Sequence, residues 1–137
     1  MRRRRCPGHR SVKMYKNILI VDSEANISAC LGFLLAHSGF NVQTACSFRE
    51  ALDSVETCQP DLVLLDTALP DRSGYELCQA LLALPHCSHL PVLMLTTQEL
   101  AMERQKAISL GAMDFIVKPF NPTEVLGRVQ ELVREAA

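Results

Sequence analysis

Short apolar runs alternate with helical patterns along most of this chain. The runs cover residues 17–21, 41–45, 62–65, 91–95 and 113–117, and their length favours β-strands. From residue 27 to residue 35, apolar side chains recur every three or four positions, which predicts a helix that ends at Gly39. Further helices are predicted over 47–58, 73–84 and 99–110, and from residue 121 onward.

Local signals mark where several of these helices begin. Ser47 and Glu50 have the spacing of a capping box, in which each side chain bonds a backbone amide of the other's turn. Ser73 and Glu76 repeat this spacing. Pro122 stands at the first helical position after Asn121, where a missing amide hydrogen costs nothing.

The alternation of strand and helix predicts an α/β fold with a doubly wound, five-stranded parallel sheet. The runs at 17–21 and 62–65 are the most uniformly apolar and suit central strands, whereas Asn41, Gln43 and Thr44 indicate an edge strand. This distribution favours the strand order 2-1-3-4-5 of a flavodoxin-like (βα)5 fold. Ligands of such sheets bind beyond the carboxyl ends of the strands.

Composition restricts the class of protein. With 137 residues and 48% hydrophobic side chains, the chain is expected to form one globular domain. No apolar run reaches the roughly 20 residues of a membrane-spanning helix, so we expect a cytoplasmic protein without membrane contact. The six cysteines form no C-x-x-C pair, and we interpret them as reduced thiols.

The charges are distributed unevenly. Residues 1–16 carry seven of the 14 basic side chains and no acidic one, which leaves seven basic against 15 acidic side chains in residues 17–137. We therefore divide the chain into a basic arm (1–16), expected to be disordered, and an acidic domain (17–137). The run of four arginines is typical of a contact with an acidic surface or of a leader that precedes the native start. We favour the leader, and the choice between Met1 and Met14 as the native start stays open.

Polar residues follow four of the predicted strands. Asp22, Ser23 and Glu24 follow the first strand, Asp66 the third, Thr96 and Thr97 the fourth, and Lys118 with Pro119 the fifth. All of them are expected at one edge of the sheet, where no glycine-rich turn is present to hold a nucleotide phosphate.

This set of groups suits phosphoryl chemistry. Clustered carboxylates bind hard cations, and a small number of oxygen ligands suits Mg²⁺. A carboxylate beside such a cation, with a hydroxyl and an ammonium nearby, is equipped to accept a phosphoryl group.

At these residues the sequence resembles a known family. Residues 17–137 are similar to the receiver domain of bacterial two-component response regulators, the CheY-like family. The resemblance rests on Asp22, on LLD ending at Asp66 with Leu69-Pro-Asp-Arg-Ser-Gly74 behind it, on PVLMLT ending at Thr96, and on FIVKPF with Lys118. Together the four motifs, in this order and spacing, are specific.

The resemblance implies a function and a set of roles. Asp66 is expected to accept a phosphoryl group from a histidine kinase or a phosphotransfer protein, with Mg²⁺ as cofactor. Asp22, Asp66 and the backbone carbonyl of Ala68 are expected to bind the metal, and Thr96 and Phe115 to form the switch. The peptide bond between Lys118 and Pro119 is expected to be cis.

One position departs from the family pattern. The family has a second acidic residue directly after the first, where this chain has Ser23. A hydroxyl is a poorer ligand for Mg²⁺ than a carboxylate, so Ser23 or Glu24 is expected to bind the metal weakly or through water. We also expect Ser23 to cap the first helix and Glu24 to lie in its first turn.

Three functions remain in view. The leading one is a phosphoacceptor module that signals by conformational switching and is not a turnover enzyme. A degenerate receiver that acts only by protein contact is the alternative, because of Ser23. An aspartyl-phosphate hydrolase of the haloacid dehalogenase type is disfavoured, because Ala68 stands where those enzymes need a second Asp.

The expected partners are a phosphodonor and a downstream protein. We predict that the downstream protein, or a second copy of the chain, binds the face formed by the helix at 99–110, the strand at 113–117 and the last helix. Direct DNA binding by this chain is not expected.

Overall fold

A computed structural model describes residues 15–97, 105–106 and 108–136. The predicted basic arm, apart from Tyr15 and Lys16, lies outside these residues, as does most of the helix predicted at 99–110. Within that helix, the described residues 105, 106, 108 and 109 are helical.

The described chain forms one five-stranded parallel sheet. The strands are β1 (Asn17–Val21), β2 (Asn41–Ala45), β3 (Leu62–Asp66), β4 (Val92–Thr96) and β5 (Asp114–Val117). Their order is β2-β1-β3-β4-β5, which confirms the predicted topology. The predicted strand boundaries are correct to within one residue.

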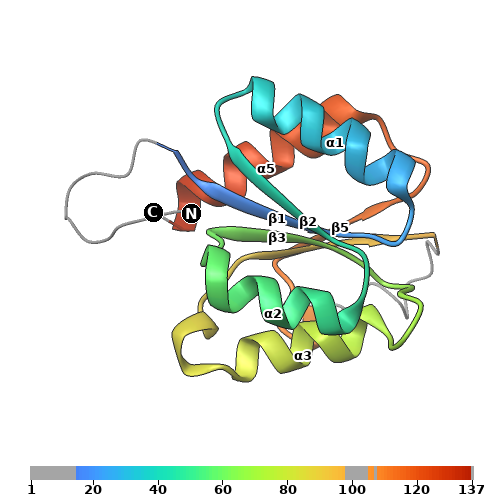
Figure 1. Ribbon diagram of the computed structural model, residues 1–137, viewed down its shortest axis with the longest axis vertical. Helices are drawn as coiled ribbons and strands as arrows, with labels where there is room; N and C mark the ends of the chain where they lie inside the picture. The colour runs from blue at the N-terminus through green and yellow to red at the C-terminus, as the bar shows by residue number, and fades with distance from the viewer. Residues whose placement is uncertain (1–14, 98–104, 107, 137) are drawn as a thin grey trace.

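Helices cover both faces of the sheet (Figure 1). They are α1 (Ala25–His37), α2 (Phe48–Cys58), α3 (Gly74–Ala83), the 3₁₀ turn η1 (Pro85–Cys87) and α5 (Pro122–Ala136). In Figure 1, α1 and α5 pack on one face, and α2 and α3 on the other. Among the described residues, no helix is long and apolar enough to cross a membrane.

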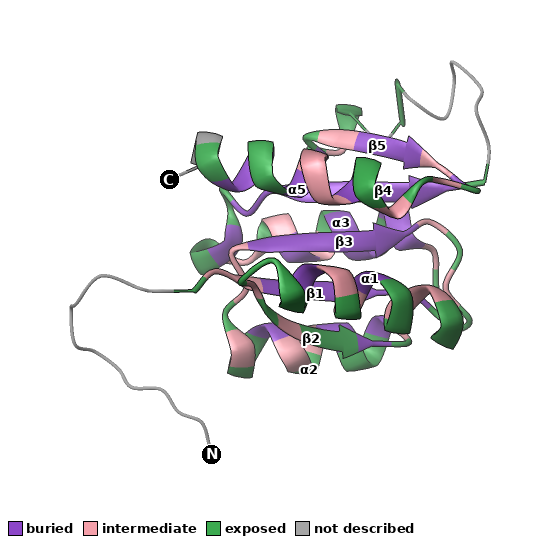
Figure 2. Ribbon diagram, turned by 90° about the horizontal axis from the view of Figure 1, so that it is seen from above, coloured by how far each residue is buried: buried purple, intermediate pink, exposed green. Residues whose placement is uncertain are grey.

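Two apolar cores follow from the alternation of side chains along the strands. In β1, Ile18 and Ile20 pack toward α1 and α5, whereas Leu19 and Val21 pack toward α2 and α3. The strands β3 and β4 are buried along their whole length, while β2 exposes most of its residues at the edge of the sheet (Figure 2). Burial on both faces explains why the central strands are continuous apolar runs.

Most of the predicted helix starts are confirmed. The Glu50 amide donates to Ser47 Oγ (3.1 Å), and the Cys46 amide donates to Glu50 Oε1 (2.8 Å). Pro122 is the first residue of α5, and the Thr123 amide donates to Asn121 Oδ1 (3.0 Å). These contacts satisfy amides that have no partner inside a helix.

The expected start of α1 is wrong. Ser23 does not cap the helix, because Glu24 occupies the capping position and makes no side-chain bond to the helix amides. Instead, the Glu24 amide donates to Asp22 Oδ1 (2.8 Å). The Asp22 carboxylate, and not Ser23, therefore accepts the backbone amide of Glu24 at the start of α1.

The described cysteines differ in burial: Cys30 and Cys46 are exposed, Cys58 is half-buried, and Cys78 and Cys87 are buried. Burial raises the pKa of the Cys78 thiol to about 11. That thiol is consequently protonated at neutral pH.

Candidate functional site at the carboxyl edge of the sheet

Four strands deliver polar side chains to one edge of the sheet, as the sequence predicts. Asp22 follows β1, Asp66 ends β3, Thr96 ends β4, and Lys118 follows β5. All four are at most 9% exposed, and they are the buried polar or charged residues of the described part of the chain. Because burial of charge is costly without partners, this cluster is a candidate functional site.

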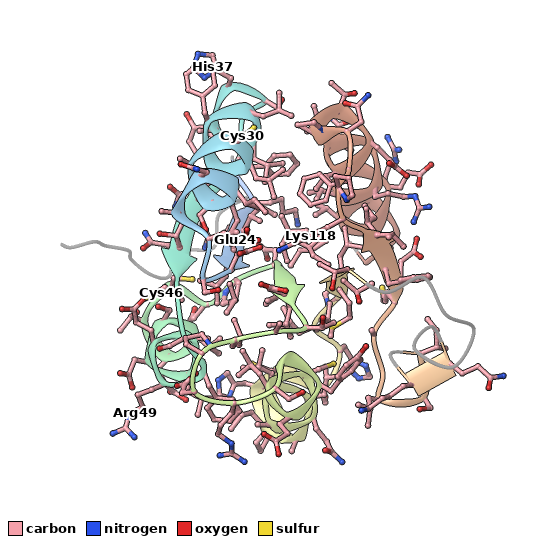
Figure 3. The ribbon with its side chains drawn as sticks, turned by 90° about the vertical axis from the view of Figure 1, so that its right-hand side faces the viewer. Glu24, Cys30, His37, Cys46, Arg49 and Lys118 are labelled. Atoms are coloured by element: carbon pink, nitrogen blue, oxygen red, sulfur yellow. The ribbon has the colours of Figure 1, made fainter. Side chains whose placement is uncertain are left out.

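The ammonium of Lys118 lies among three carboxylates. Its Nζ atom is 2.9 Å from Asp22 Oδ2, 3.0 Å from Glu24 Oε1 and 3.4 Å from Asp66 Oδ2. Figure 3 shows Glu24 and Lys118 close together above the strand ends. One positive charge therefore faces three negative ones.

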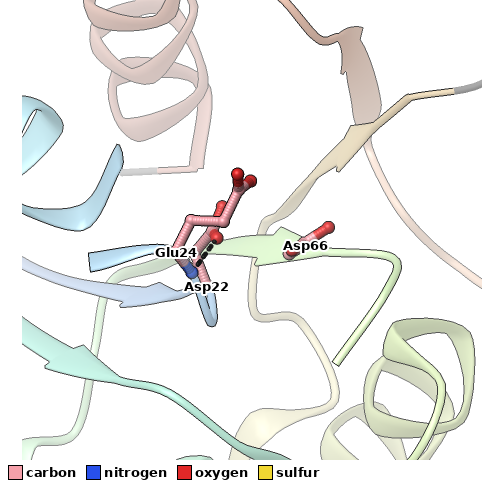
Figure 4. Close-up of side chains that lie close together, drawn as sticks. All are labelled: Asp22, Glu24 and Asp66. Carbon is pink, nitrogen blue, oxygen red and sulfur yellow. Dashed lines mark hydrogen bonds between the residues drawn. The ribbon is translucent and has the colours of Figure 1, made fainter. Parts of the chain in front are cut away.

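The three carboxylates form a compact oxygen cluster (Figure 4). Asp22, Glu24 and Asp66 each offer an oxygen within 4.8 Å of the others. Asp22 and Asp66 are buried, whereas the side chain of Glu24 is 61% exposed. Hard oxygen ligands, close spacing and excess negative charge fit a small divalent cation.

Burial and neighbouring charges shift two pKa values in the cluster. The pKa of Asp66 is raised, chiefly by burial and further by the charge of Asp22, although the Ala68 amide and Lys118 act in the opposite direction. For Lys118, burial acts to lower the pKa, but hydrogen bonds to Asp22 and Glu24 outweigh it and the pKa is raised. Lys118 is therefore positively charged. The charged form of Asp66, in contrast, is disfavoured.

The backbone fixes the direction of Asp66 and Lys118. The Ala68 amide donates to Asp66 Oδ1 (3.1 Å), and the Lys118 amide donates to the Thr96 carbonyl (2.6 Å). The peptide bond between Lys118 and Pro119 is cis, as the family resemblance implies.

Gly74 allows α3 to begin directly against the end of β3. A Cβ atom at this position would lie 2.0 Å from the Asp66 carbonyl oxygen and 2.7 Å from Thr67 Cα. Only glycine leaves room for this approach.

Ser23 and Glu24 do not occupy the helix-start positions expected of them. Ser23 is exposed, and Glu24 lies before the first turn of α1 with its carboxylate against Lys118. Sequence reasoning missed this ion pair, since nothing in the local pattern distinguishes Glu24 from a helix-start acid.

The two residues expected to form the switch lie on neighbouring strands. Thr96 pairs with Val117, and Phe115 pairs with Met94 two residues back along the same ladder. Phe115 is 9% exposed and packs in the apolar core on the side of α2 and α3. The pairing of β4 with β5 thus leads from the edge of the sheet that carries Asp66 to the Phe115 ring in the core.

The family of this chain is shown by comparison with known proteins. The model of the response regulator receiver domain matches residues 18–130, and the chain belongs to this family. Members are signalling modules, which favours this class over the dehalogenase-type hydrolase.

Individual relatives agree with this assignment. The alkaline phosphatase synthesis transcriptional regulatory protein PhoP of Bacillus subtilis is 40% identical over 123 residues, which are 90% of this chain and 50% of that protein. The chain spans about half the length of the curated relatives it matches.

Solved structures have the same fold. The chemotaxis response regulator CheY4 of Vibrio cholerae superposes with a TM-score of 0.82 at 30% identity, covering 86% of this chain and 98% of that one. The BeF3-activated N-terminal receiver domain of Klebsiella pneumoniae RstA gives a TM-score of 0.79 at 26% identity, covering 86% and 98%.

Proposed function

We propose that this receiver domain is a phosphoacceptor and that Asp66 is the residue modified. The observation that carries the proposal is the burial of Asp66 beside Asp22 and Lys118 at the ends of β1, β3 and β5. The phosphoryl group comes from the phosphohistidine of a histidine kinase or a phosphotransfer protein. An Asp66 oxygen forms the bond to phosphorus as the bond from phosphorus to the donor nitrogen breaks.

The neighbouring residues have separate roles. The ammonium of Lys118 pairs with the oxygens of the incoming phosphoryl group, and the hydroxyl of Thr96 donates a hydrogen bond to one of them. Asp22, Asp66 and the backbone carbonyl of Ala68 would hold Mg²⁺, which would supply positive charge beside the transferring group. After transfer, the covalent bond neutralises one Asp66 oxygen and new phosphoryl oxygens take up the contact with Lys118.

Beryllofluoride tests this proposal without a phosphodonor, because it occupies the place of a phosphoryl group on a carboxylate. The wild-type chain should bind beryllofluoride in the presence of Mg²⁺, as monitored by ¹⁹F NMR. Asp66→Asn removes the carboxylate and should abolish the bound signal. A bound signal of equal size in Asp66→Asn excludes Asp66 as the acceptor.

Glu24 supplies the third carboxylate of the metal site in this chain, in place of the acidic residue that Ser23 replaces. This proposal is supported by the closeness of the Glu24, Asp22 and Asp66 oxygens. In a Mg²⁺ titration, Glu24→Gln should weaken binding, and Ser23→Asp should strengthen it. If Glu24→Gln leaves the affinity unchanged, Glu24 serves only as a partner of Lys118.

The degenerate receiver is kept as a second candidate on one observation, the exposed Ser23 at a position where the family has an acid. In that case the domain would act by protein contact alone. Failure of both Mg²⁺ and beryllofluoride to bind the wild-type chain favours it.

The signal leaves the domain through a surface next to β5. A recess of about 560 Å³ lies there, lined by Ile108, Asp114, Phe115, Ile116, Val117, Glu124 and Arg128. Arg128 and Asp114, both in its lining, form an ion pair, and Ile108 and Met113 are exposed beside β5. A downstream protein or a second copy of the chain binds at this surface, and Phe115 changes its packing when Asp66 is modified.

A further inference from the structure

The loop between β3 and α3, residues 67–73, is fixed at its base to the candidate site. The Ala68 amide donates to Asp66 Oδ1 (3.1 Å), and the Gly74 amide donates to the Thr67 carbonyl (2.9 Å). Ala68 and Ser73 also form a backbone bridge across the base. The conformation of this loop and the direction of the Asp66 carboxylate are therefore linked.

The tip of the same loop is fixed to a different element, α2. Asp71 Oδ1 accepts the amide of Phe48 (2.9 Å), and Asp71 Oδ2 accepts the amide of Arg49 (3.3 Å). These are the first two residues of α2, and their amides have no partner within the helix. The Arg72 amide also donates to Asp71 Oδ1 (3.1 Å), which closes the tip on itself.

Arg72 adds a second contact between the tip and α2. Its guanidinium lies 4.3 Å from the centre of the Phe48 ring, and its Nε atom donates to Glu76 Oε1 (3.2 Å). Phe48 itself belongs to the apolar core on this face of the sheet. Because this cation lies over a buried aromatic ring, the contact fixes the orientation of the loop tip as well as attaching it to α2.

The bonds to Asp71 go beyond the local cap of α2. Ser47 already bonds the Glu50 amide from within the helix start, whereas Asp71 reaches the amides of Phe48 and Arg49 from 23 and 22 residues away. These amide bonds, the one from Phe48 foremost, hold the pKa of Asp71 below its usual range. The carboxylate is thus in its charged, strongly accepting form at neutral pH.

We propose that Asp71 is a positioning residue for the phosphoacceptor site. By holding the loop tip on α2, it keeps the Ala68 backbone and the Asp66 carboxylate in the arrangement that binds Mg²⁺. This inference rests on the proposed function, since it concerns the same metal site. Residues that orient metal ligands without touching the metal commonly change its affinity by roughly 10- to 100-fold when they are replaced.

Two alanine variants at the same helix end separate positioning from simple capping. Asp71→Ala removes the link between the loop and α2, whereas Ser47→Ala removes a cap bond and leaves the loop untouched. In Mg²⁺ titrations of the full chain, Asp71→Ala should lower the affinity by about tenfold or more. Ser47→Ala should stay within about twofold of the wild type, although it also lowers the melting temperature.

A conservative variant provides the rescue. Asp71→Asn keeps one acceptor oxygen on a side chain of the same length, and should restore the affinity to within about threefold of the wild type. The proposal is overturned if Asp71→Ala and Ser47→Ala lower the affinity equally, or if Asp71→Ala leaves it unchanged.

An NMR readout keeps this test independent of the proposed function. Without Mg²⁺, Asp71→Ala should move the backbone amide signals of Ala68 and Asp66, and Ser47→Ala should not. If the wild type fails to bind Mg²⁺ but these signals move, the metal site is refuted and the positioning by Asp71 stands. If the Ala68 and Asp66 signals stay in place in Asp71→Ala, the positioning itself is refuted.

Discussion

A single lysine offsets only part of the negative charge of the candidate site. The ammonium of Lys118 contacts Asp22, Glu24 and Asp66, of which only Glu24 is largely exposed. Two buried carboxylates beside one ammonium keep an excess of negative charge, which a divalent cation can neutralise. The apolar strand β3 can end in a charged residue because groups from other strands stabilise that charge.

The raised pKa of Asp66 predicts a pH dependence of stability. An acid whose pKa is higher in the folded state binds protons more tightly there, so its ionisation lowers the free energy of unfolding as the pH rises above the ordinary value of about 3.9. Burial is the main cause of the shift. Without metal, Asp66→Asn should therefore be more stable than the wild type at neutral pH.

Urea unfolding of both chains in EDTA, from pH 4 to pH 8, measures this difference. The advantage of Asp66→Asn should shrink toward acid pH, and Mg²⁺ should reduce it at pH 7 by stabilising the wild type. If the wild type is more stable than Asp66→Asn at pH 7 in EDTA, the charge of Asp66 does not destabilise the fold.

Sequence predicts some of the site residues and not others. Asp22, Asp66, Thr96 and Lys118 could be predicted because each directly follows or ends an apolar strand, and parallel strands end at a common edge. Sequence also named Glu24 as a weak metal ligand, but not its ion pair with Lys118, 94 residues away. The bonds of Asp71 to amides 23 and 22 residues away were not predicted either. Such contacts depend on how helices pack on the sheet, which no local pattern encodes.

At the scale of elements, α3 begins close against the end of β3. Gly74→Ala would place a methyl group 2.0 Å from the Asp66 carbonyl oxygen. Since the obstacle is backbone, either α3 or the end of β3 has to shift. We expect a loss of about 3 kcal/mol in the free energy of unfolding, together with weaker Mg²⁺ binding.

Gly127 in α5 offers the matched control. A Cβ atom there meets nothing within 4 Å, so Gly127→Ala should raise the free energy of unfolding by up to about 1 kcal/mol through helix propensity. Chemical denaturation of both variants measures the pair. A Gly74→Ala variant as stable as the wild type contradicts the close packing of α3 on β3.

The elements themselves were predictable because their signals are local. Apolar runs located all five strands, and the capping residues Ser47 and Asn121 located two helix starts. The start of α1 was not predictable, because the Asp22 carboxylate, which belongs to the site, accepts the Glu24 amide. Ser23 is left exposed. The short turn η1 was also missed, since Pro85 suggested only the end of the preceding helix.

At the scale of the whole molecule, modification of Asp66 should reach the surface beside β5. We predict that beryllofluoride with Mg²⁺ changes amide NMR shifts at residues 105–134, because Thr96 turns toward the new oxygens and Phe115 repacks. Thr96→Ala should still bind the ligand but reduce these distant shifts, because the connecting hydroxyl is lost. Shifts that remain near Asp66 in the wild type, or spread equally in Thr96→Ala, refute this route and direct attention to α1, where Phe33 is 67% exposed.

Intact-mass analysis after treatment with acetyl phosphate and Mg²⁺ tests the central claim most directly, since it asks whether the chain accepts a phosphoryl group and where. The wild type should gain the mass of one phosphoryl group, which peptide mapping should locate at Asp66, and Asp66→Asn should gain none. If the wild type gains no mass, or if Asp66→Asn gains as much as the wild type, the chain is not a phosphoacceptor through Asp66.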